Sequence, residues 1–313
     1  MYRHGVYNRI EMKTLGLMLL AGGLAWSAES QPVFEFHSNF WVNLHHSIYE
    51  KAAAKANEPS DSEEWNAAVE YYRREVVKND LLTKEMSGIN DKLSELQDTQ
   101  SLQASGLRPE LIAALASAAP VYKTRWWPSQ HQANLDWIAA AAPLAVKYGG
   151  VLTKQLAAVY QTEWPKEPIR TDVSGYASWA GAYTSTHPTH ITISSADPSY
   201  KGSASLEMLF HEASHAINRK VDEALSAELK AENKLFQRRS FGHAVLFYTA
   251  GELVRRLLDG YVPYAIKNGL YDRGWQGALP VLEKDWNPYL DGKMDLQTAA
   301  RRLVADYGIN AGK

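Results

Sequence analysis

The spacing of apolar residues predicts helices in the first half of the chain. Trp65, Val69 and Tyr72 recur at intervals of three or four residues, which is the period of an amphipathic helix with one buried face. The helices predicted on this basis span residues 62–79, 109–118, 129–148 and 151–164. Gly149 and Gly150 are expected to end the third of these helices, because glycine is a poor helix former.

After residue 167 the pattern changes to alternation, which predicts strands. The segment at residues 168–174 alternates in this way, and residues 180–184 are expected to form a second strand. Residues 189–194 are rich in β-branched residues and predict a third strand. A further short strand is expected at Phe34–Phe36. The helical period then returns over residues 203–217, 221–238, 241–255 and 296–307. This order of elements predicts an α+β fold that is mainly helical, with a small mixed β-sheet.

The apolar helix predicted at 203–217 contains His211, Glu212 and His215. Residues four apart lie about 40° apart around a helix, so the two imidazoles project from one face and can share a Zn²⁺ ion. Glu212 lies about 100° from His211. Its carboxylate is therefore beside the ion and can act as general base toward a metal-activated water. The alternative is a surface helix with two unrelated histidines, which the apolar flanking residues disfavour.

This His-Glu-x-x-His pattern resembles that of the zincin metallopeptidases. The resemblance covers residues 168–258 and implies a zincin-like fold, with the small sheet above the zinc helix. It also implies hydrolysis of peptide bonds in a peptide or protein substrate. The strand before the helix is expected to form a sheet edge to which substrate backbone pairs. Peptide as the substrate comes from the resemblance, since the spacing alone indicates only a metal hydrolase.

A catalytic zinc site has three protein ligands, so one more residue must complete it. The metzincin class is excluded, because the second histidine is followed by Ala-Ile-Asn-Arg-Lys without the required glycine and histidine. Resemblance to the gluzincin class implies a glutamate from a later helix, and the candidates are Glu223, Glu228, Glu232 and Glu252. Glu252 is the expected ligand, because the apolar residues around it would bury a carboxylate that needs a partner.

His243 is the alternative third ligand. It lies 252 − 243 = 9 residues before Glu252, about 180° away on one helix, so both cannot face the same ion. If Glu252 binds zinc, the resemblance implies that His243 acts catalytically as a donor to the oxyanion. Tyr248, one turn before Glu252, is a second candidate donor. The structural alternative for Glu252 is an ion pair with Arg255 or Arg256.

Five other histidines are expected to have lesser roles. His37, His45 and His46 could form a second metal site, but packing in a core or a cleft wall is the favoured interpretation. His187 and His190 lie at the start of the strand predicted at residues 189–194, and they are expected at the rim of the cleft.

Composition narrows the ligand types and the partners. The chain has no cysteine, which excludes thiolate ligands and disulfides and leaves histidine and carboxylate for zinc. The formal net charge is −2 and there is no long basic run, which argues against a nucleic-acid partner.

The N-terminus has the pattern of a secretory signal peptide. Arg3, Arg9 and Lys13 precede an apolar run at residues 15–26 that is short for a membrane span and ends in small residues. We expect residues 1–27 to be the signal peptide, with Met12 as an alternative start. The mature protein is then periplasmic or secreted, without stable membrane insertion; an uncleaved anchor is the alternative.

Residues 28–313 are expected to form a single zincin-like catalytic domain. Its parts are a helical N-terminal layer (28–166), the sheet with the zinc helix (167–219) and a helical C-terminal subdomain (220–313). Two other functions remain open. One is a secreted binding protein that keeps the scaffold without turnover, and the other is a zinc hydrolase of another amide, such as a cell-wall peptide.

Overall fold

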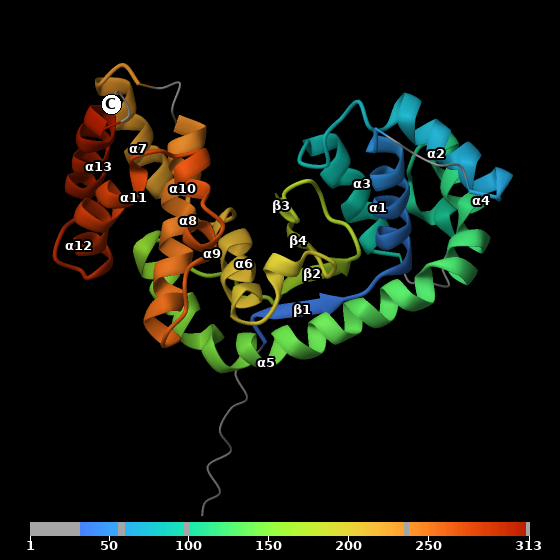
Figure 1. The fold of residues 1–313 in the computed structure, drawn as a ribbon, viewed down its shortest axis with the longest axis horizontal. Coiled ribbons are helices and arrows are strands. Elements are labelled where there is room, and N and C mark those ends of the chain that lie inside the picture. The colour runs from blue at the N-terminus through green and yellow to red at the C-terminus, as the bar shows by residue number, and fades with distance from the viewer. Residues whose placement is uncertain (1–31, 56–59, 97–100, 235–237, 311–313) are drawn as a thin grey trace, which may run out of the picture. The chain divides into compact units, whose positions relative to one another are not determined.

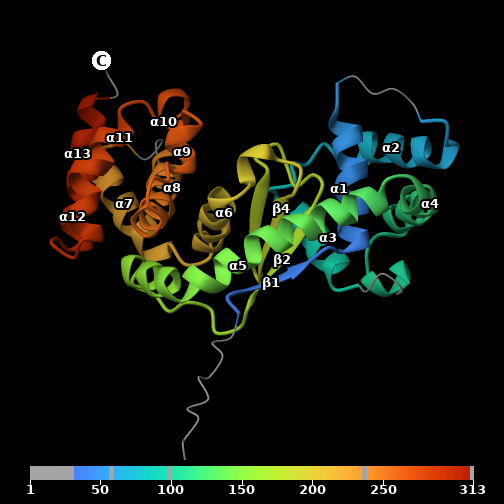
Figure 2. The ribbon, with the colours of Figure 1, turned by 60° about the horizontal axis from the view of Figure 1, so that its bottom comes forward.

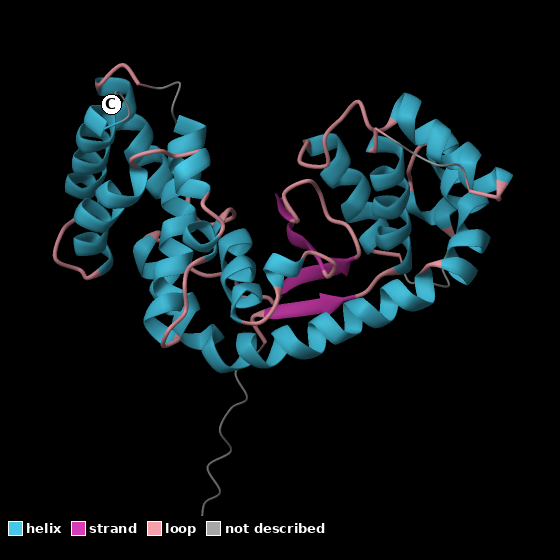
Figure 3. Ribbon diagram, viewed as in Figure 1, coloured by secondary structure: helices cyan, strands magenta, loops and turns pink. Residues whose placement is uncertain are grey.

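Helices surround a small sheet in the computed structural model, which describes residues 32–55, 60–96, 101–234 and 238–310 (Figure 3). The predicted signal peptide at 1–27 and the alternative start at Met12 lie outside the described residues. No helix within the described ranges has the length and hydropathy needed to cross a membrane.

Four short strands form one mixed sheet, as the alternating segments predict. The strands are β1 (Phe34–His37), β2 (Ile169–Ser174), β3 (Ala182–Thr186) and β4 (Thr189–Ser194). Their order is β1-β2-β4-β3, with β1, β2 and β4 parallel and β3 antiparallel to β4. This order leaves β3 at one edge of the sheet. The prediction of a mainly helical α+β fold with a small mixed sheet is therefore confirmed.

Two groups of helices lie at opposite ends of the long helix α5, with the sheet between them (Figure 1). The first group is α1 (Phe40–Ala53), α2 (Glu63–Glu75), α3 (Lys84–Ser94) and α4 (Pro109–Arg125). After the sheet come α6 (Ser203–Ser214), α7 (Arg219–Ala231), α8 (Arg238–Leu257), α9 (Tyr264–Lys267), α10 (Leu270–Arg273), α11 (Ala278–Val281), α12 (Asn287–Leu290) and α13 (Leu296–Asn310).

The two faces of the sheet belong to different hydrophobic cores. Side chains such as Val173 and Ile191 pack in a core with α5, α6 and the C-terminal helices. On the other face, Tyr183 packs in a core formed by α1 to α4. Asn90 of α3 donates a hydrogen bond of 2.9 Å to Thr192 on that face. The sheet therefore joins the two cores, which belong to one compact unit of the chain.

Helix α5 (Trp127–Val159) is one continuous helix of 33 residues, so the predicted break at Gly149 and Gly150 is wrong. Gly149 is buried where α5 meets the start of β1 and helix α6. A Cβ atom at this position would lie 2.9 Å from Val33 Cγ2 and 3.9 Å from Phe210 Cζ. The missing side chain permits this close packing, and tertiary contact outweighs the low helix propensity of glycine. Figure 2 shows α5 lying across the strands.

Candidate metal site

Helix α6 carries the His-Glu-x-x-His motif and holds it in the larger core. Leu209 and Phe210 are fully buried, so the helix is firmly packed next to the motif. His211 and His215 lie one helical turn apart, with their ring centroids separated by 5.1 Å. The Glu212 side chain is also buried, at 5% exposure.

Helix α8 adds His243 to this pair. The Nε2 atom of His243 lies 3.2 Å from Nε2 of His211, and its ring centroid lies 5.3 Å from that of His215. One ligand nitrogen from each histidine lies within 4.8 Å of the other two. Two nitrogens bound tetrahedrally at about 2.05 Å to one zinc ion would be about 3.3 Å apart. The three imidazoles are therefore close enough to hold a single metal ion.

Burial keeps these three imidazoles in the neutral form that binds metal. Burial, followed by the neighbouring imidazoles of His215 and His243, holds the pKa of His211 well below its usual value. Burial and then His243 lower the pKa of His215 to about 3. Burial lowers the pKa of His243 to about 4. At neutral pH the cluster therefore offers three uncharged nitrogen ligands.

A hydroxyl from the edge strand holds the carboxyl group of Glu212. Thr184 Oγ1 lies 2.7 Å from Glu212 Oε2 and 3.0 Å from the main-chain carbonyl oxygen of the same residue. Burial raises the pKa of Glu212 to about 7, and the hydrogen bond from Thr184 opposes that rise. A carboxyl group with a pKa near neutrality can both accept and donate a proton at pH 7.

One cavity of about 660 Å³ contains all of these groups. Its floor includes the three histidines and Glu212, and one wall is strand β3. All five residues of β3, from Ala182 to Thr186, line the cavity. Successive side chains of a strand point to opposite faces, so residues from both faces of β3 border the cavity. This indicates that the edge of β3 away from β4, with which no other strand in the described ranges pairs, faces the cavity.

The structure corrects the prediction that Glu252 is the third ligand. Helix α8 includes both His243 and Glu252, so the nine-residue spacing places them on opposite sides of one helix. The Glu252 carboxylate accepts hydrogen bonds from Arg255 at 2.7 and 2.8 Å and from Arg256 at 2.8 Å. Burial alone would raise the pKa of Glu252, but the two arginines outweigh it and lower the pKa. The ion-pair alternative is confirmed, and His243 takes the place beside His211 and His215.

Tyr248 does not lie at the histidine cavity either. It lines a separate pocket together with Glu252 and Arg255, so its predicted role as an oxyanion donor at the motif is wrong. His243 lies with His211 and His215 in the one group of described residues that could hold a metal ion, so the structure places it as a candidate ligand. The remaining candidate glutamates each pair with a nearby cation: Glu223 with Arg219, Glu228 with Arg301 and Glu232 with Lys234.

Two of the remaining histidines are core residues, as the favoured interpretation predicts. His45 Nδ1 lies 2.8 Å from the hydroxyl of Tyr72, and His46 Nε2 lies 2.8 Å from the hydroxyl of Tyr183. Both histidines are fully buried. His37 is partly buried and pairs with Glu35 at 3.2 Å. Among the described residues, the only group of three or more potential ligands close enough to hold a metal is the His211 cluster.

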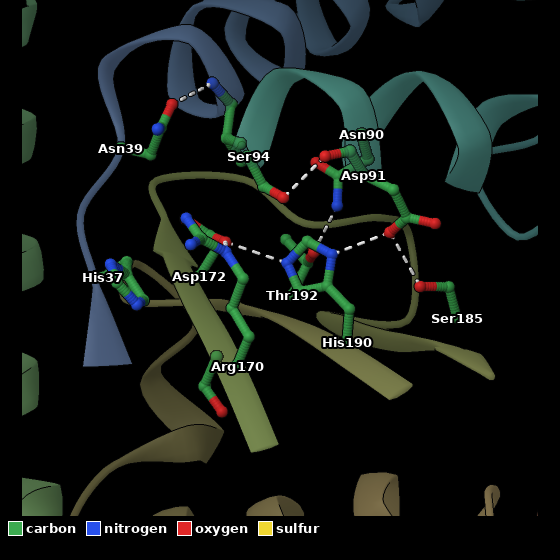
Figure 4. Close-up of polar contacts among 12 residues, drawn as sticks. His37, Asn39, Asn90, Asp91, Ser94, Arg170, Asp172, Ser185, His190 and Thr192 are labelled. Carbon is green, nitrogen blue, oxygen red and sulfur yellow. Dashed lines mark hydrogen bonds and ion pairs between the residues drawn. The ribbon is translucent and has the colours of Figure 1, made fainter. Parts of the chain in front are cut away.

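His187 lies at the cavity, as expected, but His190 is not a rim residue. His190 is 2% exposed, and its two ring nitrogens each lie 2.8 Å from a carboxylate, Asp91 on one side and Asp172 on the other (Figure 4). Arg170 donates to Asp172 at 2.7 Å. Burial alone would lower the pKa of His190, but its hydrogen bonds to the two carboxylates outweigh it and raise the pKa. This buried network ties α3 to the sheet.

The sequence analysis does not identify two residues that lie beside the motif, Thr184 and Phe247. Thr184 is 212 − 184 = 28 residues from Glu212, and only the fold brings them together. The Phe247 ring lies over His211, with centroids 3.8 Å apart. Phe247 follows His243 by four residues in α8, so the two side chains lie on the same face of this helix. Placing His243 at the site therefore also predicts Phe247 there.

Comparison with known proteins supplies no relative for this chain. A scan against protein-family models, a search of curated proteins and a search of solved structures each found no significant match.

Proposed function

We propose that this chain is a zinc-dependent peptidase. The observation that supports the proposal most strongly is the convergence of three neutral imidazoles and one buried carboxyl group on a single cavity. The resemblance of the motif on α6 to that of the zincins points to the same chemistry. In gluzincins the third ligand is a glutamate, whereas here it would be a histidine. We therefore propose the zinc-dependent peptidase reaction but not membership of the gluzincin class.

His211, His215 and His243 would hold the ion. Three nitrogen ligands with a fourth position open to solvent or substrate are typical of catalytic rather than structural zinc sites. The 3.2 Å separation of two of the nitrogens suits binding to a common ion. When bound, zinc supplies Lewis acidity, polarising a carbonyl oxygen and lowering the pKa of water to about 7.

Glu212 is the proposed general base. Its carboxylate takes a proton from the attacking water and returns it to the leaving amine. Thr184 orients the carboxyl group through its hydroxyl. The Glu212 carboxyl group lines the same cavity as the three histidines, which places it beside the position that the ion would occupy.

The edge of β3 supports a peptide as the substrate. Main-chain N–H and C=O groups on an unpaired strand edge can hydrogen-bond to an extended peptide with little regard for its sequence. This edge forms a wall of the same cavity as Glu212.

We further propose that the reaction takes place in the periplasm or outside the cell, on the basis of the signal-like pattern at residues 1–27.

The direct test compares the wild-type protein with Glu212→Gln. We expect the variant to bind one zinc ion per chain like the wild type but to hydrolyse fluorogenic peptides at least about 100-fold more slowly, since general-base catalysis contributes that much or more. Glu223→Gln is a matched control, because Glu223 is an exposed residue paired with Arg219. It should retain full activity.

Other outcomes separate the alternatives. Zinc binding without hydrolysis by either protein would favour a binding protein on this scaffold. Equal hydrolysis by the wild type and Glu212→Gln would remove Glu212 from the mechanism.

A further inference from the structure

Two exposed apolar side chains lie at the cavity that contains the histidine cluster. Trp179 is 75% exposed and Leu82 is 47% exposed, and both line this cavity. They come from distant segments, since Trp179 precedes β3 and Leu82 precedes α3. A large aromatic side chain in water beside a cavity is typical of a surface that binds another molecule.

One carboxylate holds these two residues in place. Asp80 Oδ2 accepts a hydrogen bond of 3.0 Å from the indole N–H of Trp179, and Asp80 Oδ1 accepts one of 2.9 Å from the main-chain N–H of Leu82. The polar edge of the indole is therefore satisfied, and its apolar surface remains exposed. A side chain that is already oriented loses less conformational entropy when a ligand binds.

The position of Trp179 near the start of β3 determines how far Trp179 and Leu82 lie from the proposed general base. Trp179 lies in a turn closed by a 3.1 Å hydrogen bond from Gly181 N to the carbonyl oxygen of Ser178. It is 184 − 179 = 5 residues before Thr184, the residue that contacts the general base. Five residues of extended chain span at most about 17 Å. A peptide along β3 therefore reaches Trp179 within three to five residues of the bond next to Glu212.

We infer that Trp179 and Leu82 form a specificity subsite for an apolar side chain, three to five residues from the scissile bond of an extended peptide. This inference rests on the proposed peptidase function. The favoured occupant is an aromatic or branched aliphatic side chain, because the exposed surface is an indole face beside an aliphatic group. A sugar ring can also stack on tryptophan, but Leu82 offers it no hydrogen-bonding partner.

The test uses binding as well as cleavage, so that it does not depend on turnover. Dye-labelled octapeptides of alanine, serine and glycine carry a single Phe, which is moved one position at a time. Their affinities are measured by fluorescence anisotropy on zinc-loaded Glu212→Gln protein, and cleavage is measured on the wild type. We expect Phe at one position, three to five residues from the cleaved bond, to increase affinity about tenfold over Ser.

Variants then assign that preference to the pair. Trp179→Ala should abolish the preference for Phe, and Leu82→Ser should weaken it, while both variants still bind one zinc ion per chain, which shows that they are folded. Val146→Ala is the matched control, because Val146 on α5 is 77% exposed and is not among the cavity residues. It should leave the preference intact.

Each result decides between the two proposals. Trp179-dependent binding without any cleavage would remove the peptidase function and would overturn a subsite placed relative to a scissile bond, leaving an apolar peptide-binding site. Cleavage with the same preference in wild type and Trp179→Ala would overturn the subsite and leave the peptidase standing. Failure of all peptides to bind, or a preference for sugar-bearing muropeptides over Phe peptides, would also overturn the subsite.

Discussion

At the scale of single residues, the Thr184 hydroxyl is the contact that most directly controls the proposed base. It is the hydrogen-bond donor that the structure places on the Glu212 side chain, at 2.7 Å from Oε2. A carboxyl group buried in an apolar environment depends strongly on such a partner for its orientation.

Thr184→Val should therefore reduce kcat about ten- to hundredfold, the range expected when a hydrogen bond to a charged group is lost. KM should stay within about twofold, because the side chain is nearly isosteric and the strand edge is unchanged. Thr184→Ser, which keeps the hydroxyl, should recover most of the activity. Steady-state kinetics on one fluorogenic peptide measure all three proteins. An equal loss in the Ser and Val variants would mean that Thr184 only packs.

The sequence was informative at this scale where the contacts are local. His211, Glu212 and His215 are within one helical turn and a half, so helix geometry alone places them together. Local patterns do not predict the contacts of Thr184 and Trp179. The partner of Thr184, Glu212, is 28 residues away in the chain, and the partner of Trp179, Asp80, is 99 residues away. Such pairings depend on the register and packing of the sheet, which local patterns do not determine.

Among the elements, helix α8 shows why the sequence favours Glu252 over His243 as the residue beside His211 and His215. The apolar pattern predicted the helix, and the 180° separation of His243 from Glu252 holds in the structure. The pattern does not predict the rotation of α8 about its axis, which decides whether His243 or Glu252 faces α6. Apolar neighbours surround both positions, and a buried carboxylate can be satisfied by arginines as well as by a metal. Arg255 and Arg256, one turn later, do so here.

Helix α5 illustrates a different limit at the same scale. Helix propensity predicted an end at Gly149, whereas contact with Val33 and Phe210 makes a small residue necessary within a continuous helix. The strand predicted from alternation at 168–174 lies at Ile169–Ser174, whereas the strand predicted at 180–184 lies two residues later, at Ala182–Thr186.

In the whole molecule, a buried charge network connects helix α3 to the sheet that the two cores share. Asp91 belongs to α3, whereas His190 and Asp172 belong to strands β4 and β2. Burial alone would raise the pKa of Asp172, but His190 and Arg170 outweigh it and lower the pKa. Both shifts favour the ionised pair, a protonated His190 beside an ionised Asp172.

This network predicts a dependence of stability on pH. The folded state raises the pKa of His190, so it binds this proton more tightly than the unfolded chain does. The resulting stabilisation is complete below the ordinary histidine pKa of about 6.5 and is lost as the pH rises through the folded value. At pH 6, His190→Gln should lower the free energy of unfolding by about 3 kcal/mol.

Urea unfolding of both zinc-saturated proteins from pH 6 to pH 9 measures this difference. The difference in the free energy of unfolding between the wild type and His190→Gln should become smaller as the pH rises. Other groups that titrate in this range, such as Glu212, affect both proteins and cancel in the comparison. A difference that stays constant from pH 6 to pH 9 would contradict a charged His190.

A crystal structure of the zinc-loaded protein, with anomalous data collected on both sides of the zinc absorption edge, shows directly whether the three histidines bind the ion. We expect one strong anomalous peak per chain, about 2.0–2.1 Å from one nitrogen each of His211, His215 and His243. Glu252 should remain paired with Arg255 and Arg256. A peak at Glu252, or no peak among the three histidines at saturating zinc, would contradict the proposed metal site and the peptidase mechanism built on it.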